Sequence, residues 1–121
     1  MKISSYRGLI VWQKVMDLAV EVYSLTKTLP KEETYGLSNP MRRAAVSVSS
    51  NIAEGQARRS TGEFLNFLSI AQGSLAELDT QIILAQRFRY TTKEQTAKVG
   101  ALIIEVSKML SSLRSKLATG H

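Results

Sequence analysis

The sequence predicts an all-α protein, an up-down-up-down antiparallel four-helix bundle that forms a single domain over residues 1–121. Apolar residues recur at spacings of three and four along four segments, which is the periodicity of helices wound in a left-handed supercoil. Both prolines, Pro30 and Pro40, lie early in the chain, so the remaining residues suit long helices. The connections between the four segments are short, which favours antiparallel neighbours.

The first half of the chain accounts for two of these helices. The first is expected at roughly 9–29, and Pro30 ends it because proline interrupts the helical hydrogen bonds. The second is expected at roughly 39–58, with Asn39 as an extended capping residue and Pro40 in the first helical position, where no amide donor is needed. Their apolar stripes are Val11, Val15, Leu18, Val22, Leu25 and Leu29 in the first helix, and Met41, Ala45, Val48 and Ile52 in the second.

The second half of the chain supplies the third helix at roughly 60–89 and the fourth at roughly 92–117. Each opens on a capping box, in which the cap side chain and a residue three positions later bond to each other's amides. The two boxes are Ser60-Thr61-Gly62-Glu63 and Thr92-Lys93-Glu94-Gln95. The apolar stripes are Phe64, Leu68, Ala71, Leu75, Leu78, Ile82 and Ala85 in the third helix, and Val99, Ile103, Val106, Leu110, Leu113 and Leu117 in the fourth.

Small polar residues interrupt the middle of the second helix. They are Ser47, Ser49, Ser50 and Asn51. Small side chains let helices approach closely, and an asparagine beside the core seam can hold the register of a helix pair. A structural role is therefore favoured over a binding role.

The first and third helices carry features beyond one core stripe. A second apolar row on the first helix, about 100° from the first row, is typical of a broad core face or of a subunit interface. In the third helix Gly73 lies away from the stripe, on the side of Ile70, where it is a tolerated surface glycine or permits close approach of another backbone. We predict a homo-oligomer. Its expected interface residues are Trp12, Met16, Tyr23, Ile70 and Gly73.

The chain is basic, with 16 Lys and Arg against 10 Asp and Glu, a formal charge of +6. Arginine occurs in pairs, and its planar fork matches phosphate in a bidentate geometry. The candidate nucleic-acid contacts are Arg42, Arg43, Arg58, Arg59, Arg87 and Arg89. The alternative is a solvated surface, or arginines paired with Glu54, Glu63 and Glu77. In an antiparallel bundle, Arg58 and Arg59 lie at one end and the other four lie toward the opposite end.

Several absences exclude catalytic classes. The chain has no cysteine, and its one histidine is His121, so thiol nucleophiles, zinc–thiolate sites and a histidine base are not expected. There is no phosphate-binding or dinucleotide-binding glycine motif. We predict no catalytic residues, no metal and no cofactor, and therefore no enzyme. The longest apolar runs are about four residues, and no signal peptide is recognisable, so a cytoplasmic protein without a membrane partner is expected.

Several blocks carry a family resemblance. They are Val11-Trp12-Gln13-Lys14 with Leu18 and Tyr23; Leu29-Pro30 with Glu33 and Tyr35-Gly36-Leu37; Arg42-Arg43-Ala44-Ala45-Val46-Ser47; Asn51-Ile52-Ala53-Glu54-Gly55; Arg58-Arg59-Ser60-Thr61; Phe64-Leu65 with Phe67-Leu68; and Ala71-Gln72-Gly73-Ser74-Leu75-Ala76-Glu77-Leu78. Over roughly residues 7–90 the sequence resembles the bacterial four-helix-bundle family encoded in intervening sequences of 23S ribosomal RNA genes. The fourth helix matches by pattern only.

The resemblance implies a bundle that assembles as a homopentameric ring without catalysis. A related branch comprises accessory proteins of diversity-generating retroelements, which are basic pentamers that bind a reverse transcriptase and nucleic acid. Carried over by position, the candidate contacts are Arg42, Arg43, Arg58 and Arg59. The predicted function is binding of RNA or other nucleic acid by a non-enzymatic oligomer. The alternatives are an accessory module for a nucleic-acid enzyme such as a reverse transcriptase, and a purely structural assembly.

Overall fold

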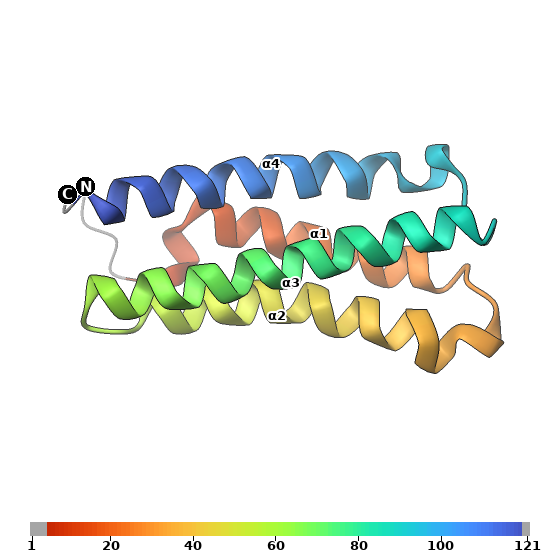
Figure 1. Cartoon of the computed structure of the whole chain (residues 1–121), viewed down its shortest axis with the longest axis horizontal. Helices are drawn as coiled ribbons and strands as arrows, with labels where there is room; N and C mark the ends of the chain where they lie inside the picture. The colour runs from red at the N-terminus through yellow and green to blue at the C-terminus, as the bar shows by residue number, and fades with distance from the viewer. Residues whose placement is uncertain (1–4, 120–121) are drawn as a thin grey trace.

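Four long helices account for most of the computed structural model, which describes residues 5–119. They are α1 (Ile10–Thr26), α2 (Asn39–Gln56), α3 (Thr61–Arg87) and α4 (Lys93–Ala118). Each packs against the next in an alternating up-down order, and α4 packs back against α1, so the bundle closes around one core (Figure 1). Residues 5–119 contain no strand. The predicted all-α four-helix bundle is confirmed.

The predicted apolar stripes form the core of the bundle. Removing such side chains from water supplies the main stabilising free energy, about 1.5–3 kcal/mol for each large aliphatic residue. The largest side chains that are fully buried are Val15, Leu18 and Val22 of α1; Met41, Val48 and Ile52 of α2; Leu68 and Leu78 of α3; and Val106 and Leu110 of α4. The periodicity of the sequence therefore identified the buried face of every helix.

The connection between α1 and α2 differs from the prediction. A short 3-10 helix, Lys31–Glu33, and a π turn, Thr34–Ser38, run directly into α2. Asn39 has helical angles (φ −67°, ψ −43°) and donates its N–H to the Thr34 carbonyl, so the expected extended cap at Asn39 is wrong. Pro40 has no N–H to continue the ladder, and a π turn before it absorbs the resulting gap in the hydrogen-bond register.

The other helix ends lie within three residues of the predicted positions. The largest difference is at α1, which ends at Thr26 because the chain turns before Pro30, although Leu29 remains buried in the core. Thr92 and Gln95 form the complete predicted capping box at α4. At α3 the Ser60 hydroxyl accepts from the Glu63 amide and donates to the Glu63 carboxylate, both at 3.1 Å.

Candidate nucleic-acid interface

The antiparallel arrangement distributes the six candidate arginines over both halves of the bundle. Arg58 and Arg59 follow the end of α2, at the same end as the beginning of α3. Arg42 and Arg43 lie near the beginning of α2, and Arg87 and Arg89 lie at the end of α3, toward the opposite end of the bundle (Figure 1). This is the distribution that helix order alone requires.

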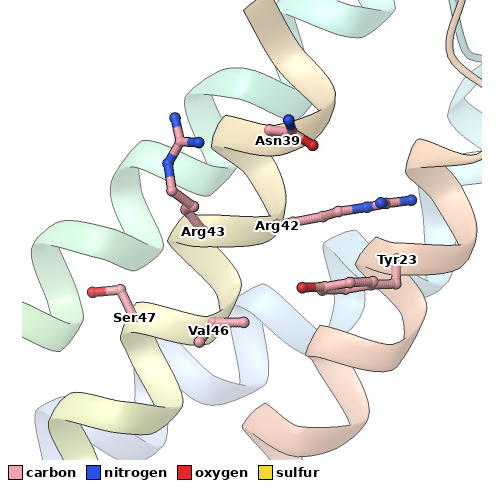
Figure 2. A pocket seen from close by; sticks show the side chains of 6 residues that line it. All are labelled: Tyr23, Asn39, Arg42, Arg43, Val46 and Ser47. Atoms are coloured by element: carbon pink, nitrogen blue, oxygen red, sulfur yellow. The ribbon is translucent and has the colours of Figure 1, made fainter. Parts of the chain in front are cut away.

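Arg42 is engaged within the bundle. Its Nε donates to Thr26 Oγ1 at 2.8 Å, and its guanidinium carbon lies 4.7 Å from the centroid of the Tyr23 ring. Figure 2 shows the Arg42 side chain extended from α2 across Tyr23 toward α1, whereas Arg43 points away from both. Adjacent arginines therefore have different roles, because Arg42 joins α1 to α2 and Arg43 remains in solvent.

Arg58 is also engaged, although it is exposed. Its Nη2 lies 3.3 Å from Glu54 Oε1, one helical turn earlier, and its guanidinium carbon lies 4.9 Å from the centroid of the Phe67 ring on α3. Exposed ion pairs of this kind contribute little free energy because water screens them. Arg58 nevertheless has a defined position over α3 that a solvated arginine would not have.

The remaining four arginines, Arg43, Arg59, Arg87 and Arg89, are exposed. No hydrogen bond or ion pair within residues 5–119 occupies their guanidinium groups. They do not form one patch. The Ser47 and Ser74 hydroxyls of antiparallel α2 and α3 lie 2.9 Å apart. Arg43, four residues before Ser47, is therefore level with residue 78, four residues after Ser74. At 1.5 Å per residue, Arg87 is roughly 13 Å further along the bundle axis.

A groove between α1 and α2 lies beside Arg42 and Arg43. It has a volume of about 680 Å³ and is open to solvent (Figure 2). It is lined by Tyr23, Asn39, Arg42, Arg43, Val46 and Ser47. The sequence did not identify Asn39 as part of this groove. Nothing local in the sequence indicates that Arg42 lies over Tyr23 and bonds to Thr26, because these residues are on different helices.

The turn between α3 and α4 holds Arg89 in an unusual backbone conformation. Its φ is +64°, the left-handed region that side chains disfavour by about 1–2 kcal/mol. The Arg89 N–H donates to the Gln86 carbonyl and the Tyr90 N–H donates to the Ala85 carbonyl, each at 3.0 Å. These two bonds form the helix-ending motif in which glycine usually occupies the left-handed position. Sequence reasoning predicted the helix end near residue 89 and missed this conformation.

Two aromatic residues flank Arg89 in this turn. Phe88 is 52% exposed, and its ring contacts the Tyr90 ring edge to face at 5.8 Å between centroids. The Tyr90 hydroxyl donates to Glu33 Oε2 at 2.9 Å, which ties this turn to the connection before α2. That hydrogen bond, followed by desolvation and by the negative charges of Glu33 and Glu32, raises the pKa of Tyr90.

The predicted interface residues fall into two groups. Met16 and Tyr23 on α1 and Ile70 on α3 are exposed apolar side chains, each more than 40% accessible. Val20 and Val46 extend the α1–α2 part of this surface. Gly73 is exposed as well, and a Cβ added there would meet no atom within 4 Å, so nothing inside the bundle requires this glycine.

Trp12 differs from the other predicted interface residues. It is partly buried against the core of its own chain, and its ring contacts the Tyr6 ring edge to face at 5.2 Å. Part of the second apolar row therefore belongs to the bundle itself, as the broad-core interpretation expected.

The polar residues in the middle of α2 form a small network. Asn51 Nδ2 donates to the Ser47 carbonyl at 2.8 Å and to Ser47 Oγ at 3.1 Å. The Ser47 hydroxyl in turn meets Ser74 of α3. Within this network the hydrogen bond between α2 and α3 is thus made by Ser47, while Asn51 supports it from the same helix. Ser49 bonds to the Val46 carbonyl of its own helix.

Metal-binding groups and membrane-spanning helices were also sought among the described residues. Within residues 5–119 no group of three His, Cys, Asp or Glu side chains could hold a metal ion. His121 lies outside the described residues. None of the helices in this range is both long and apolar enough to cross a bilayer.

Comparisons with known proteins place the chain in a family. No curated protein matches the sequence. A crystal structure of a protein with unknown function, from the S23 ribosomal protein family of Bacteroides thetaiotaomicron, superposes with a TM-score of 0.80 at 29% identity, covering 87% of this chain and 98% of that one. The model of the 23S rRNA-intervening sequence proteins matches residues 7–112. The resemblance seen in the sequence is confirmed, and the chain belongs to the 23S rRNA-intervening sequence protein family.

Proposed function

We propose that this protein is a non-enzymatic, homo-oligomeric four-helix bundle of the cytoplasm that binds RNA or another nucleic acid through its exposed arginines. The observation that carries this proposal is that Arg43, Arg59, Arg87 and Arg89 are exposed and have no partner within residues 5–119. An arginine without an internal carboxylate keeps all its donors for phosphate. The net charge of +6 favours encounter with a polyanion.

Self-association would strengthen this binding. Exposed Met16, Val20 and Tyr23 on α1, and Ile70 beside Gly73 on α3, are the surfaces that a second copy would cover. A pentamer, as the family resemblance implies, would carry about five times the +6 of one chain. Repeated arginines around one axis would then contact several phosphates at once, which raises avidity without any new contact.

A salt titration with matched charge variants tests the nucleic-acid part of this proposal. The test variant is Arg43→Ala/Arg87→Ala, which removes two unpaired arginines. The control is Lys14→Ala/Lys98→Ala, which removes the same charge from lysines that pair with Glu105 and Glu21. Affinity for a structured RNA and for a DNA duplex is measured by fluorescence anisotropy across a range of salt concentrations.

Four phosphate contacts per chain predict a slope of log affinity against log salt of roughly −3.6 on duplex DNA. The test variant should flatten this slope by roughly 1.8, and the control should change it by less than half as much. Absence of binding to both RNA and DNA at low salt would contradict the proposal, as would equal effects of the two double variants.

Light scattering tests the oligomeric part. We expect a mass several times 13.4 kDa at micromolar concentration. Met16→Glu/Val20→Glu should lower the mass, because buried carboxylates without partners oppose association. Ile83→Glu/Ile104→Glu, which places the same charge at two exposed apolar residues of α3 and α4 outside the predicted interface, serves as the control. A monomer in the wild type would contradict this part.

The first alternative is an accessory module that binds a nucleic-acid enzyme such as a reverse transcriptase. The groove beside Arg42 and Arg43, with Tyr23 and Val46 in its lining, is the observation that favours it. A partner that remains bound after Arg43→Ala/Arg87→Ala but is lost after changes at Tyr23 or Val46 would support this alternative. A purely structural assembly would show neither kind of binding.

A further inference from the structure

The turn at the end of α3 presents three consecutive exposed side chains, Arg87, Phe88 and Arg89. The turn lies at the tip of the bundle (Figure 1). Half of the Phe88 side chain is accessible to solvent, and no ion pair within residues 5–119 involves either arginine. Phe88 lies between these two unpaired arginines in the sequence, its ring contacts Tyr90, and it is outside the buried core, whose last residue on α3 is Ala85.

The backbone holds these side chains in place at a conformational disadvantage. Arg89 adopts the left-handed conformation for which glycine is the ordinary residue. Two hydrogen bonds that end α3 fix the turn, and the bond from Tyr90 to Glu33 anchors it to the connection before α2. A disfavoured conformation that the surrounding structure over-determines is typical of functional positions. The backbone of the turn is therefore fixed, and so are the positions from which the three side chains extend.

This chemistry matches one kind of ligand. Every nucleobase can stack on an aromatic ring, and guanidinium groups beside that ring can reach the phosphates that flank the base. A base inside a duplex has both faces covered by its neighbours, so only an unpaired base can use such a ring. Residues 87–94 contain three basic residues and one acidic residue, and the carboxylates of Glu33 and Glu32 also act on Tyr90, so the attraction for phosphate rests on the unpaired Arg87 and Arg89 and not on the net charge of the turn.

We infer that Arg87, Phe88 and Arg89 form a platform for one unpaired nucleobase and its flanking phosphates. The inference rests on the proposed function and specifies its ligand: a single-stranded segment, loop or bulge bound at the end of α3. The other exposed arginines, Arg43 and Arg59, have no aromatic ring beside them in the sequence and bind phosphate without this selectivity.

The platform is tested with a 12-nucleotide single strand that contains one 2-aminopurine, prepared as RNA and as DNA, and with the corresponding duplexes. Stacking on Phe88 should quench the fluorescence of the modified base. Phe88→Leu keeps an apolar side chain without a ring, and should weaken single-strand binding about ten-fold while leaving duplex binding and the salt slope unchanged. Tyr35→Leu removes an 85% exposed ring that has no adjacent arginine, and is the matched control.

Variants at Arg89 provide a second measurement that does not depend on the ring. Arg89→Gly should raise the melting temperature and weaken binding, whereas Arg89→Lys should keep most of the binding. Circular dichroism spectra of all variants establish that the helices are retained. Replacing this one arginine should therefore separate stability from function.

The outcomes distinguish the platform from the proposed function. The platform would be overturned if wild type and Phe88→Leu bound single strands with equal affinity, or if Phe88→Leu and Tyr35→Leu lost equal affinity. In either case, salt-dependent binding by the wild type would still support the proposed function. Unchanged binding in Arg89→Gly would also overturn it. A wild type that binds neither single strands nor duplexes at low salt would contradict the proposed function itself.

Discussion

The two ends of α3 make opposite uses of glycine and arginine. Near its beginning, Gly55 of α2 is buried, and a Cβ there would lie 2.7 Å from Phe67 Cβ, so close packing requires the glycine. Near its end, Arg89 occupies a left-handed conformation in which glycine would be favoured and packing requires nothing. In α2, Gly55 is the residue that packing demands, whereas the turn after α3 has at Arg89 a residue that the backbone disfavours. The turn after α3 is therefore the stronger candidate for a functional position.

The largest expected effect comes from adding a side chain at Gly55, where α2 packs closely against α3. Gly55→Val should destabilise the protein by about 3 kcal/mol, because the added atoms must displace Phe67 and Phe64 in a close helix contact. Urea unfolding followed by circular dichroism measures this change. Gly73→Ala is the control: a Cβ there meets no atom, so it should stabilise the isolated bundle by about 1 kcal/mol. Equal changes in the free energy of unfolding at the two glycines would contradict the conclusion that close packing requires Gly55.

The next largest effect has the opposite sign. Arg89→Gly should stabilise the protein by about 1 kcal/mol, since glycine adopts a φ of +64° without strain. For a bundle of this size the melting temperature should rise by roughly 4 °C. A fall in the melting temperature would show that the Arg89 side chain stabilises the turn, and would remove the contrast between the two ends.

A smaller effect separates the adjacent arginines after α2. Arg58→Ala should lower the free energy of unfolding by about 0.7 kcal/mol, because the contact with the Phe67 ring and the pair with Glu54 are both exposed. Arg59→Ala, at an exposed residue without a partner within residues 5–119, should change it by less than about 0.3 kcal/mol. The free energy of unfolding of both variants is measured by urea denaturation at equal ionic strength.

The smallest effect concerns the tie at the α3–α4 turn. The Glu33 hydrogen bond raises the pKa of Tyr90 above its ordinary value of 10.0, so the bond stabilises the folded state when Tyr90 is protonated. This contribution is complete below pH 10 and is lost as the pH rises through the raised pKa. Tyr90→Phe should therefore lower the melting temperature by about 1–2 °C at pH 7, and the difference from wild type should shrink in alkaline buffer. A constant difference across this pH range would contradict this assignment.

Local sequence patterns predicted most of the fold. Val15, Leu18 and Leu68 follow a helical repeat that is readable from neighbouring residues, and Thr92 with Gln95 is a cap defined within four positions. The exception was Asn39, where the expected cap became part of a π turn. A proline can begin a helix or interrupt one that is already under way, and the identity of Pro40 does not distinguish these cases.

The candidate site was less predictable because it depends on contacts between distant segments. The arginines themselves are visible in the sequence, but which of them are free is not. Arg42 is engaged because Thr26 and Tyr23 of another helix lie beside it, whereas its neighbour Arg43 points to solvent. Phe88 and Arg89 carried one local signal, an Arg-Phe-Arg run just beyond the last core position. No local signal in the sequence indicated the positive φ of Arg89 or the hydrogen bond from Tyr90 to Glu33.

By itself the sequence determined the helices, their buried faces and the total charge, because these depend on the identity and spacing of nearby residues. The tertiary structure decided which charges are available and how the turns are held. The Glu33 carboxylate and the Tyr90 hydroxyl are 57 residues apart and meet only when both connections reach the same end of the bundle. Burial follows a local period, whereas pairing requires two side chains brought together by the packing of whole helices.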